Sequence, residues 1–162
     1  MSLVTDEGQR ISVVGAQSLS VWLPADWEVD REQRLFEFVG LGPSEVPYRA
    51  NVSIHHVSVD PDVSVEAIAD ATASNQARTL ETFVEYDRRP GALAGSPALH
   101  REYAWVQGGT GLVLYQLQDV ALPETIRGRL LEVHATSFAP AFFRYAGLFR
   151  RIIESIQVEP AP

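Results

Sequence analysis

The sequence contains neither cysteine nor lysine among its 162 residues, and its 13 basic residues are all arginine. Without cysteine, the chain has no disulfide framework, thiolate metal site, cysteine nucleophile or lipidated cysteine. Without lysine, Schiff-base and lysine general-base mechanisms are excluded. Such complete use of arginine is typical of a GC-rich bacterial genome, so we expect a bacterial protein.

Positive charge is scarce as well. Thirteen basic residues stand against 21 acidic ones, which gives a formal net charge of −8. Nucleic-acid affinity depends on clustered cations, and the short pairs Arg88-Arg89 and Arg150-Arg151 do not provide such a cluster. The sequence also has no apolar run long enough for a signal peptide or a membrane span. We therefore expect a cytoplasmic protein with no nucleic-acid partner and no membrane span.

The composition is that of a globular protein, with 46% hydrophobic and 21% charged residues. A domain of this length can bury roughly 68–70% of the surface that its unfolded chain exposes. No repeat, low-complexity tract or long linker divides the chain. We predict a single domain over 1–162, with flexible ends at 1–9 and 159–162.

Most of the chain shows the period-two alternation of half-buried strands. The clearest case is 19–23, where Leu19, Val21 and Leu23 alternate with polar or aromatic residues until Pro24 ends the strand. The same reasoning predicts strands at 10–14, 19–23, 35–39, 50–59, 83–88, 98–106, 112–119 and 129–136. The last four form an antiparallel meander.

Two segments have helical periodicity. The first spans 65–80, with Ser64 as N-cap and Glu66 in the first turn. The second begins at Pro140 and carries the most apolar stripe of the chain: Phe142, Tyr145, Ala146, Phe149, Ile152, Ile153 and Ile156. We predict an α+β fold in which helices pack on an antiparallel sheet of about six or more strands.

Three segments carry a family resemblance: 19–29, 95–103 and 142–158. They contain an amphipathic strand ending in Pro-x-x-Trp, a Gly-x-Pro-Ala strand entry and a terminal helix running into Ser155-Ile156. In these features the chain resembles the PsbP-like superfamily, which includes PsbP, the Ran-binding Mog proteins and the bacterial LpqN/LpqT and DcrB relatives. The resemblance implies an antiparallel sheet with packed helices and a non-catalytic binding role, and it transfers no functional residue.

Two histidines raise the question of a chemical site. His100 and Glu102 share one face of a predicted strand, as do His134 and Glu132. If the strands align, these four side chains could form a metal site or an acid/base cluster. Hydrogen-bonded polar positions on an antiparallel sheet are the favoured alternative. The sequence also lacks a Gly-x-Ser-x-Gly elbow. We assign no catalytic, cofactor-binding or metal-binding residue and expect no enzyme.

The leading functional hypothesis is a binding or accessory domain that recognises a protein without a cofactor. Trp22 and Trp105 are candidate anchors if one sheet face is open, and Arg101 and Arg144 are candidate rim residues. Phe143 and Leu148 lie off the main apolar stripe of the last helix and indicate a docking surface or a homodimer. The predicted partner surface comprises Trp22, Arg101, Trp105, Phe143, Arg144 and Leu148.

Two other hypotheses remain open at this stage. One is a carrier of a small apolar ligand or lipid, with a cavity between the sheet and the terminal helix lined by Phe142, Phe149 and Trp105. An internal cavity of roughly 300 Å³ or more would support it. The least favoured is a metal-dependent hydrolase that uses His100 and His134.

Overall fold

The computed structural model describes residues 7–14 and 17–160. Its larger sheet has seven strands in the order β3-β4-β5-β9-β8-β7-β6, and every neighbouring pair is antiparallel. These strands are β3 (Glu28–Val29), β4 (Phe38–Leu41), β5 (Asn51–Ser58), β6 (Glu81–Leu93), β7 (Ser96–Val106), β8 (Val113–Ala121) and β9 (Arg129–Phe138). The predicted antiparallel α+β fold is confirmed.

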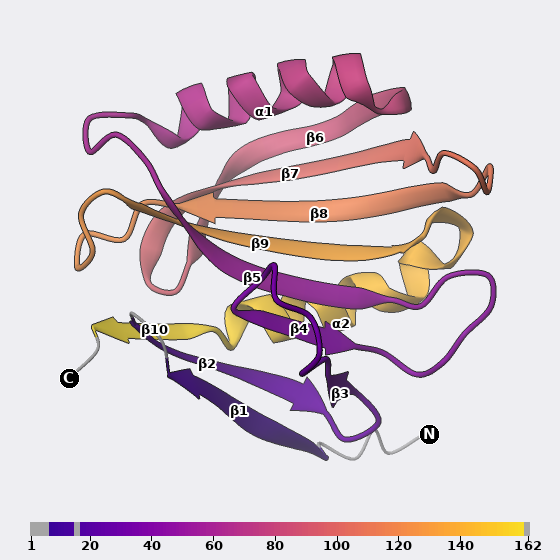
Figure 1. The fold of residues 1–162 in the computed structure, drawn as a ribbon, viewed down its shortest axis with the longest axis horizontal. Coiled ribbons are helices and arrows are strands. Elements are labelled where there is room, and N and C mark those ends of the chain that lie inside the picture. The colour runs from indigo at the N-terminus through magenta and orange to yellow at the C-terminus, as the bar shows by residue number, and fades with distance from the viewer. Residues whose placement is uncertain (1–6, 15–16, 161–162) are drawn as a thin grey trace.

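A smaller sheet has the order β1-β2-β10. It is formed by β1 (Gly8–Val14), β2 (Gln17–Pro24) and β10 (Gln157–Pro160). Figure 1 shows this sheet beneath the larger one, with β10 following α2 (Phe142–Glu154). A short 3-10 turn, Ala139–Ala141, precedes α2, and the other helix is α1 (Val65–Thr79).

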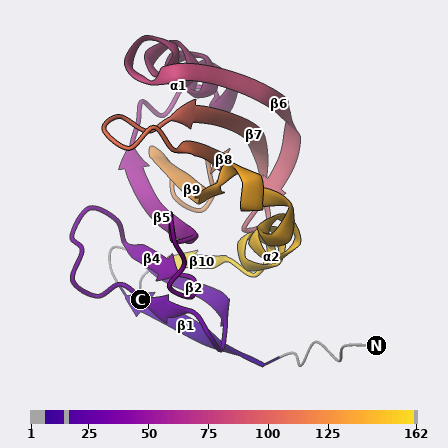
Figure 2. The same ribbon diagram turned by 90° about the vertical axis from the view of Figure 1, so that its right-hand side faces the viewer.

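The two helices lie on opposite sides of the larger sheet, as Figure 2 shows. α1 packs against β6 and β7, whereas α2 packs against β9 and against β2 of the smaller sheet. Because cross-strand partners share a face, the register assigns each sheet residue to the α1 side or the α2 side. This assignment decides which polar residues can form a common site.

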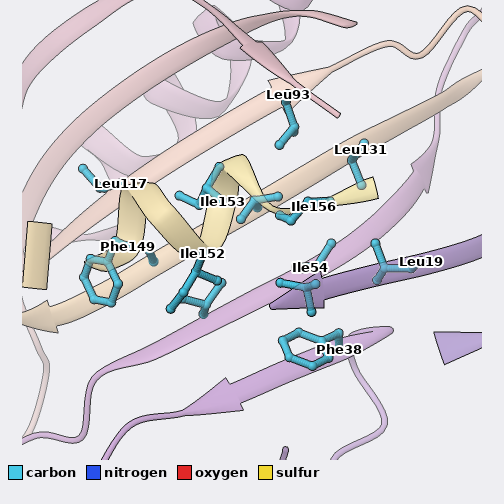
Figure 3. Close-up of a cluster of buried hydrophobic side chains, with 14 of the residues drawn as sticks. Leu19, Phe38, Ile54, Leu93, Leu117, Leu131, Phe149, Ile152, Ile153 and Ile156 are labelled. Carbon is cyan, nitrogen blue, oxygen red and sulfur yellow. The ribbon is translucent and has the colours of Figure 1, made fainter. Parts of the chain in front are cut away.

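The main core lies between the larger sheet, α2 and the smaller sheet. Phe149 and Ile152 of α2 are fully buried there, and Ile156, just after the helix, is almost fully buried. They belong to one cluster with Leu131 of the larger sheet and Leu19 of the smaller one. Figure 3 shows Ile156 between Leu131 and Leu19. α2 is therefore the element that joins the two sheets.

α1 packs on the larger sheet with fewer buried side chains than α2. Its N-cap is Ser64, as predicted, and the Ser64 side chain accepts a hydrogen bond from the Ala67 backbone N–H at 3.1 Å. Ala69 is the buried residue of this helix, and it packs on a small cluster with Leu99, Val120 and Leu130. The small side chains let the helix lie close to the sheet.

Both ends of the described chain contain strand residues. Gly8 and Gln9 belong to β1, Glu159 and Pro160 belong to β10, and these residues pair with β2. Residues 1–6 and 161–162 lie outside the described residues. The strand predicted at 35–39 begins only at Phe38, because the Gln33 side chain holds the backbone of Phe36 in a turn.

Candidate functional site

A pocket of about 180 Å³ lies between α2 and the strands β6, β7 and β8. Its chemistry comes from charged side chains on the sheet and from one aromatic and one basic residue of the helix. The lining includes Arg89, His100, Glu102, Asp119, Phe142 and Arg150. Such a lining offers charged groups from the sheet beside apolar side chains of the helix.

His100 is the centre of the polar part of the pocket. Its Nδ1 lies 3.0 Å from Asp119 Oδ1, and its Nε2 lies 2.9 Å from Glu102 Oε2. His100 and Asp119 are direct partners in the β7–β8 register, which explains their contact. Burial alone lowers the pKa of His100, but the hydrogen bonds to the two carboxylates outweigh it and raise the pKa above its usual value.

Two neighbours complete this charge cluster. The Tyr115 hydroxyl donates a hydrogen bond to Glu102 Oε1 at 3.1 Å. Burial and the nearby Glu102 raise the pKa of Tyr115 to about 12, so the hydroxyl stays a donor at physiological pH. Arg89 Nη1 donates to Asp87 and lies 3.8 Å from Glu102 Oε2. Asp87 pairs with Glu102 in the β6–β7 register.

An exposed apolar surface lies on the same side of the sheet, beside the start of α2. Tyr86 stacks on Tyr115, and Tyr115 lies against Phe142, with ring centroids 5.9 and 4.0 Å apart. Val84 is placed on this side because it pairs with Ala104, which in turn pairs with Tyr115. We call this set the α2-side aromatic surface: Val84, Tyr86, Val113, Tyr115, Phe142 and Phe143.

The exposure of this surface is large for apolar side chains. Phe143 is 79% exposed and Tyr86 is 63% exposed, and Val84 and Val113 are also exposed. Four of the six exposed large hydrophobic residues in the described part of the chain belong to it. A contiguous exposed apolar patch on a globular protein marks an interaction site more often than isolated exposed residues do.

The α1 side of the sheet carries a separate polar network. Arg101 is fully buried there, with Nη1 2.5 Å from Gln118 Oε1 and Nη2 2.8 Å from Gln76 Oε1 of α1. Glu132 lies 3.1 Å from His134 Nε2 and 3.2 Å from His55 Nε2. Burial works to raise the pKa of Glu132, but its hydrogen bonds to the two histidines prevail and hold that pKa well below the usual range.

His100 and His134 do not converge. His134 pairs with Gln118 in the sheet register, whereas His100 pairs with the next residue, Asp119. A shift of one residue places the two histidines on opposite faces of the sheet. The four-residue cluster of His100, Glu102, His134 and Glu132 considered from the sequence is therefore wrong, and with it the basis for a hydrolase that uses both histidines.

The predicted partner surface is dispersed in the structure. Arg101 cannot be a rim residue, because it is fully buried on the α1 side. Trp105 is half-buried on that same side beside Tyr103, with ring centroids 5.9 Å apart. Trp22 lies on the smaller sheet, where the Arg151 guanidinium carbon sits 4.2 Å from its ring centroid.

The remaining predicted surface residues belong to α2. Phe143 is highly exposed and forms part of the α2-side aromatic surface. Arg144 is also exposed, and its Nη2 lies 2.6 Å from Glu45 Oε1. Leu148 is half-buried and packs against the main core. Of the six predicted residues, Phe143 is the one that the structure places in the exposed aromatic patch.

The apolar cavity predicted for a lipid carrier does not match the structure. Phe149 is fully buried in the core, and Trp105 faces the α1 side, so the two do not line one cavity with Phe142. The pocket beside α2 has about 180 Å³ and a lining that mixes charged with apolar residues. Its volume is below the roughly 300 Å³ expected of an apolar carrier, and its charged residues differ from an apolar lining.

Several residues of the site were missed in the sequence analysis. Tyr86, Val84 and Val113 belong to predicted strands, but nothing in their spacing shows that they are exposed. Irregularities between Glu81 and Val84 and between Glu85 and Asp87 shift the register of β6, so simple alternation misplaces its side chains. The signal that was available is the pair of aromatic residues Tyr86 and Tyr115 on strands of the predicted meander.

The fold is that of the PsbP and Mog1p proteins. LpqN of Mycobacterium tuberculosis, described as involved in cell envelope biogenesis, matches with a TM-score of 0.71 and 14% identity over 96% of this chain and 93% of LpqN. CyanoP, the PsbP of Synechocystis sp. PCC 6803, matches with a TM-score of 0.64 and 16% identity over 98% of this chain and 96% of CyanoP.

The Ran-binding protein Mog1p of Saccharomyces cerevisiae has a TM-score of 0.63 and 8% identity, over 93% of this chain and 95% of Mog1p. No protein-family model matches the sequence, and no curated protein matches it. At these identities the likeness establishes the fold. Among the described residues, neither helix has the length and apolar character required to cross a membrane.

Proposed function

We propose that this protein is a non-catalytic binding domain that recognises a protein partner through the α2-side aromatic surface. The observation that carries the proposal is the exposure of Tyr86, which stacks on Tyr115, and of Phe143, which follows the Tyr115 neighbour Phe142 in α2. Aromatic side chains are the commonest anchors of protein interfaces, because each contributes a large contact area with little loss of conformational freedom.

Tyr115, the partly buried ring of this surface, is already held in one position in the unbound protein. Tyr115 is held by a close, tilted ring contact with Phe142 and by its hydrogen bond to Glu102. Tyr86 rests on that ring with an interplanar angle of 20°. A preorganised anchor loses less side-chain entropy on binding than a free one.

The charge of the protein supports a basic partner. Acidic residues outnumber basic ones by 21 to 13, which gives a formal net charge of −8. Complementary charge raises the association rate and disfavours like-charged partners. We therefore propose a partner with an apolar centre and a basic rim. Mog1p, which is described as Ran-binding, is a protein of this fold with a protein partner.

Differential capture tests the proposal. Wild-type protein and the double variant Tyr86→Ser/Phe143→Ser are immobilised, and lysate of the source organism is passed over both. The control is Leu35→Ser, because Leu35 is 86% exposed but lies away from this surface. We expect at least one protein to be retained by the wild type and the control and to fall at least tenfold with the double variant.

Equal retention by all three proteins would contradict the proposal, as would an equal loss with Leu35→Ser. Sedimentation of the same proteins tests whether the partner is a second copy of this chain. If the wild type is a dimer and the double variant a monomer, the partner is a second copy of this chain.

A further inference from the structure

We propose that Asp87, His100 and Glu102 bind a divalent transition-metal ion of the zinc type, with Asp119 as the carboxylate that orients the histidine. The three ligands come from the neighbouring strands β6 and β7, and Asp119 comes from β8. One nitrogen and two carboxylate oxygens form a donor set that suits zinc and related ions.

The first argument is proximity. One ligand atom from each of Asp87, His100 and Glu102 lies within 4.8 Å of the others. Ligand atoms of a tetrahedral zinc site are about 3.4 Å apart, since each bond is about 2.0–2.1 Å long. Small side-chain rotations close the difference. Paired strands fix the backbone beneath these residues, because Asp87 is the cross-strand partner of Glu102.

The second argument is the orientation of the histidine. Asp119 Oδ1 lies 3.0 Å from Nδ1, which directs the other ring nitrogen, Nε2, towards Glu102 at 2.9 Å. Metal-bound histidines commonly have such a carboxylate on the nitrogen that does not bind the metal. The Tyr115 hydroxyl holds Glu102 Oε1 at 3.1 Å, so Oε2 is the oxygen that faces the histidine.

The cluster carries an excess of negative charge. Asp87, Glu102 and Asp119 place three carboxylates around one histidine, and Arg89 pairs with two of them, Asp87 and Glu102. Arg89 Nη1 donates to Asp87 and lies 3.8 Å from Glu102 Oε2. Its side chain is 51% exposed, so it can turn into solvent when an ion takes its place. The arginine and the ion therefore compete for the same two carboxylates.

Access comes from the pocket beside α2. His100 and Glu102 both line it, and its volume of about 180 Å³ leaves room for an ion with a water ligand. On the other side of the sheet, Glu132 lies 3.1 Å from His134 and 3.2 Å from His55, but among the described residues these three do not offer ligand atoms that all lie within 4.8 Å of one another. Glu132 and His134 supply a matched control within the same chain.

Titration calorimetry with zinc chloride on metal-free protein tests the proposal. We expect one zinc ion per chain for the wild type. His100→Gln and Glu102→Gln should weaken binding at least tenfold, and Asp119→Asn about tenfold or more, as outer-shell partners usually do. Arg89→Gln should tighten binding, because it removes the competing cation. His134→Gln should bind zinc like the wild type.

Thermal melts followed by circular dichroism verify that each variant is folded, and the gain in affinity with Arg89→Gln is a result that misfolding cannot produce. Absence of saturable zinc binding would overturn the proposal. It would also be overturned if zinc binds equally to the wild type and to His100→Gln, or if His134→Gln weakens binding as much as His100→Gln does.

Discussion

The ring of Tyr86 stacks on that of Tyr115, with centroids 5.9 Å apart and an interplanar angle of 20°. The outer ring is 63% exposed, whereas the inner ring is half-buried and bonded to Glu102. An exposed aromatic ring supported in this way contributes little to folding, yet it is well suited to meet another molecule. The first prediction separates these two roles.

Tyr86→Ser and Phe143→Ser should each change the free energy of unfolding by about 1 kcal/mol or less, as surface substitutions do. Phe149→Ala should cost about 3–5 kcal/mol, because it leaves a cavity in the core. Urea denaturation followed by fluorescence measures all three. A loss of several kcal/mol with Phe143→Ser would show that the residue belongs to the core.

Arg101 should matter for stability although it was expected at a binding rim. Arg101→Met should lower the free energy of unfolding by about 2–4 kcal/mol, because Gln118 and Gln76 lose their donor in a buried site. Arg34→Met is the control, since Arg34 is exposed and bonds only to nearby backbone carbonyls. Equal midpoints for the two variants would contradict this role.

Glu132 should make stability depend on acid pH. Its pKa is depressed in the folded protein, so its contribution is present above the ordinary value of 4.5 and is lost as the pH falls towards the folded pKa. Glu132→Gln should cost about 1–3 kcal/mol at pH 6. The difference from the wild type should shrink at pH 3, as denaturation at both pH values measures. A difference that stays constant between these pH values would rule out this linkage.

The two helices should differ in their dynamics. α1 buries Ala69 alone among its residues, whereas α2 buries Phe149, Ile152 and Ile153. Segments with few buried apolar contacts open more readily than the core. Hydrogen exchange followed by mass spectrometry should therefore show faster exchange in α1 than in α2, and equal protection would contradict the prediction.

Much of the fold follows from local patterns. Alternation of Leu19, Val21 and Leu23 predicts a strand with one buried face, and the apolar stripe of α2 predicts a helix in the core. The strand β10 was missed because Gln157–Pro160 has no apolar alternation of its own and is ordered by pairing with β2. Pairing of this kind depends on distant residues, which local periodicity does not report.

The candidate site was harder to predict, because it depends on register. His100 and His134 look equivalent in the sequence, but a shift of one residue separates them onto opposite faces. Phe143 was proposed as a surface residue from its place outside the helical stripe. Tyr86 was not, since its exposure depends on where α2 begins and on the irregular register of β6.

Site-specific photocrosslinking is the most direct test of whether the α2-side aromatic surface recognises a protein partner. Phe143 is replaced by the photoreactive analogue p-benzoylphenylalanine in cells of the source organism, and the same analogue at Leu35 serves as the control. We expect a discrete crosslinked protein band from position 143 that is absent from position 35 and is lost when Tyr86→Ser is added. No band from position 143, or the same bands from both positions, would contradict recognition of a protein partner through this surface.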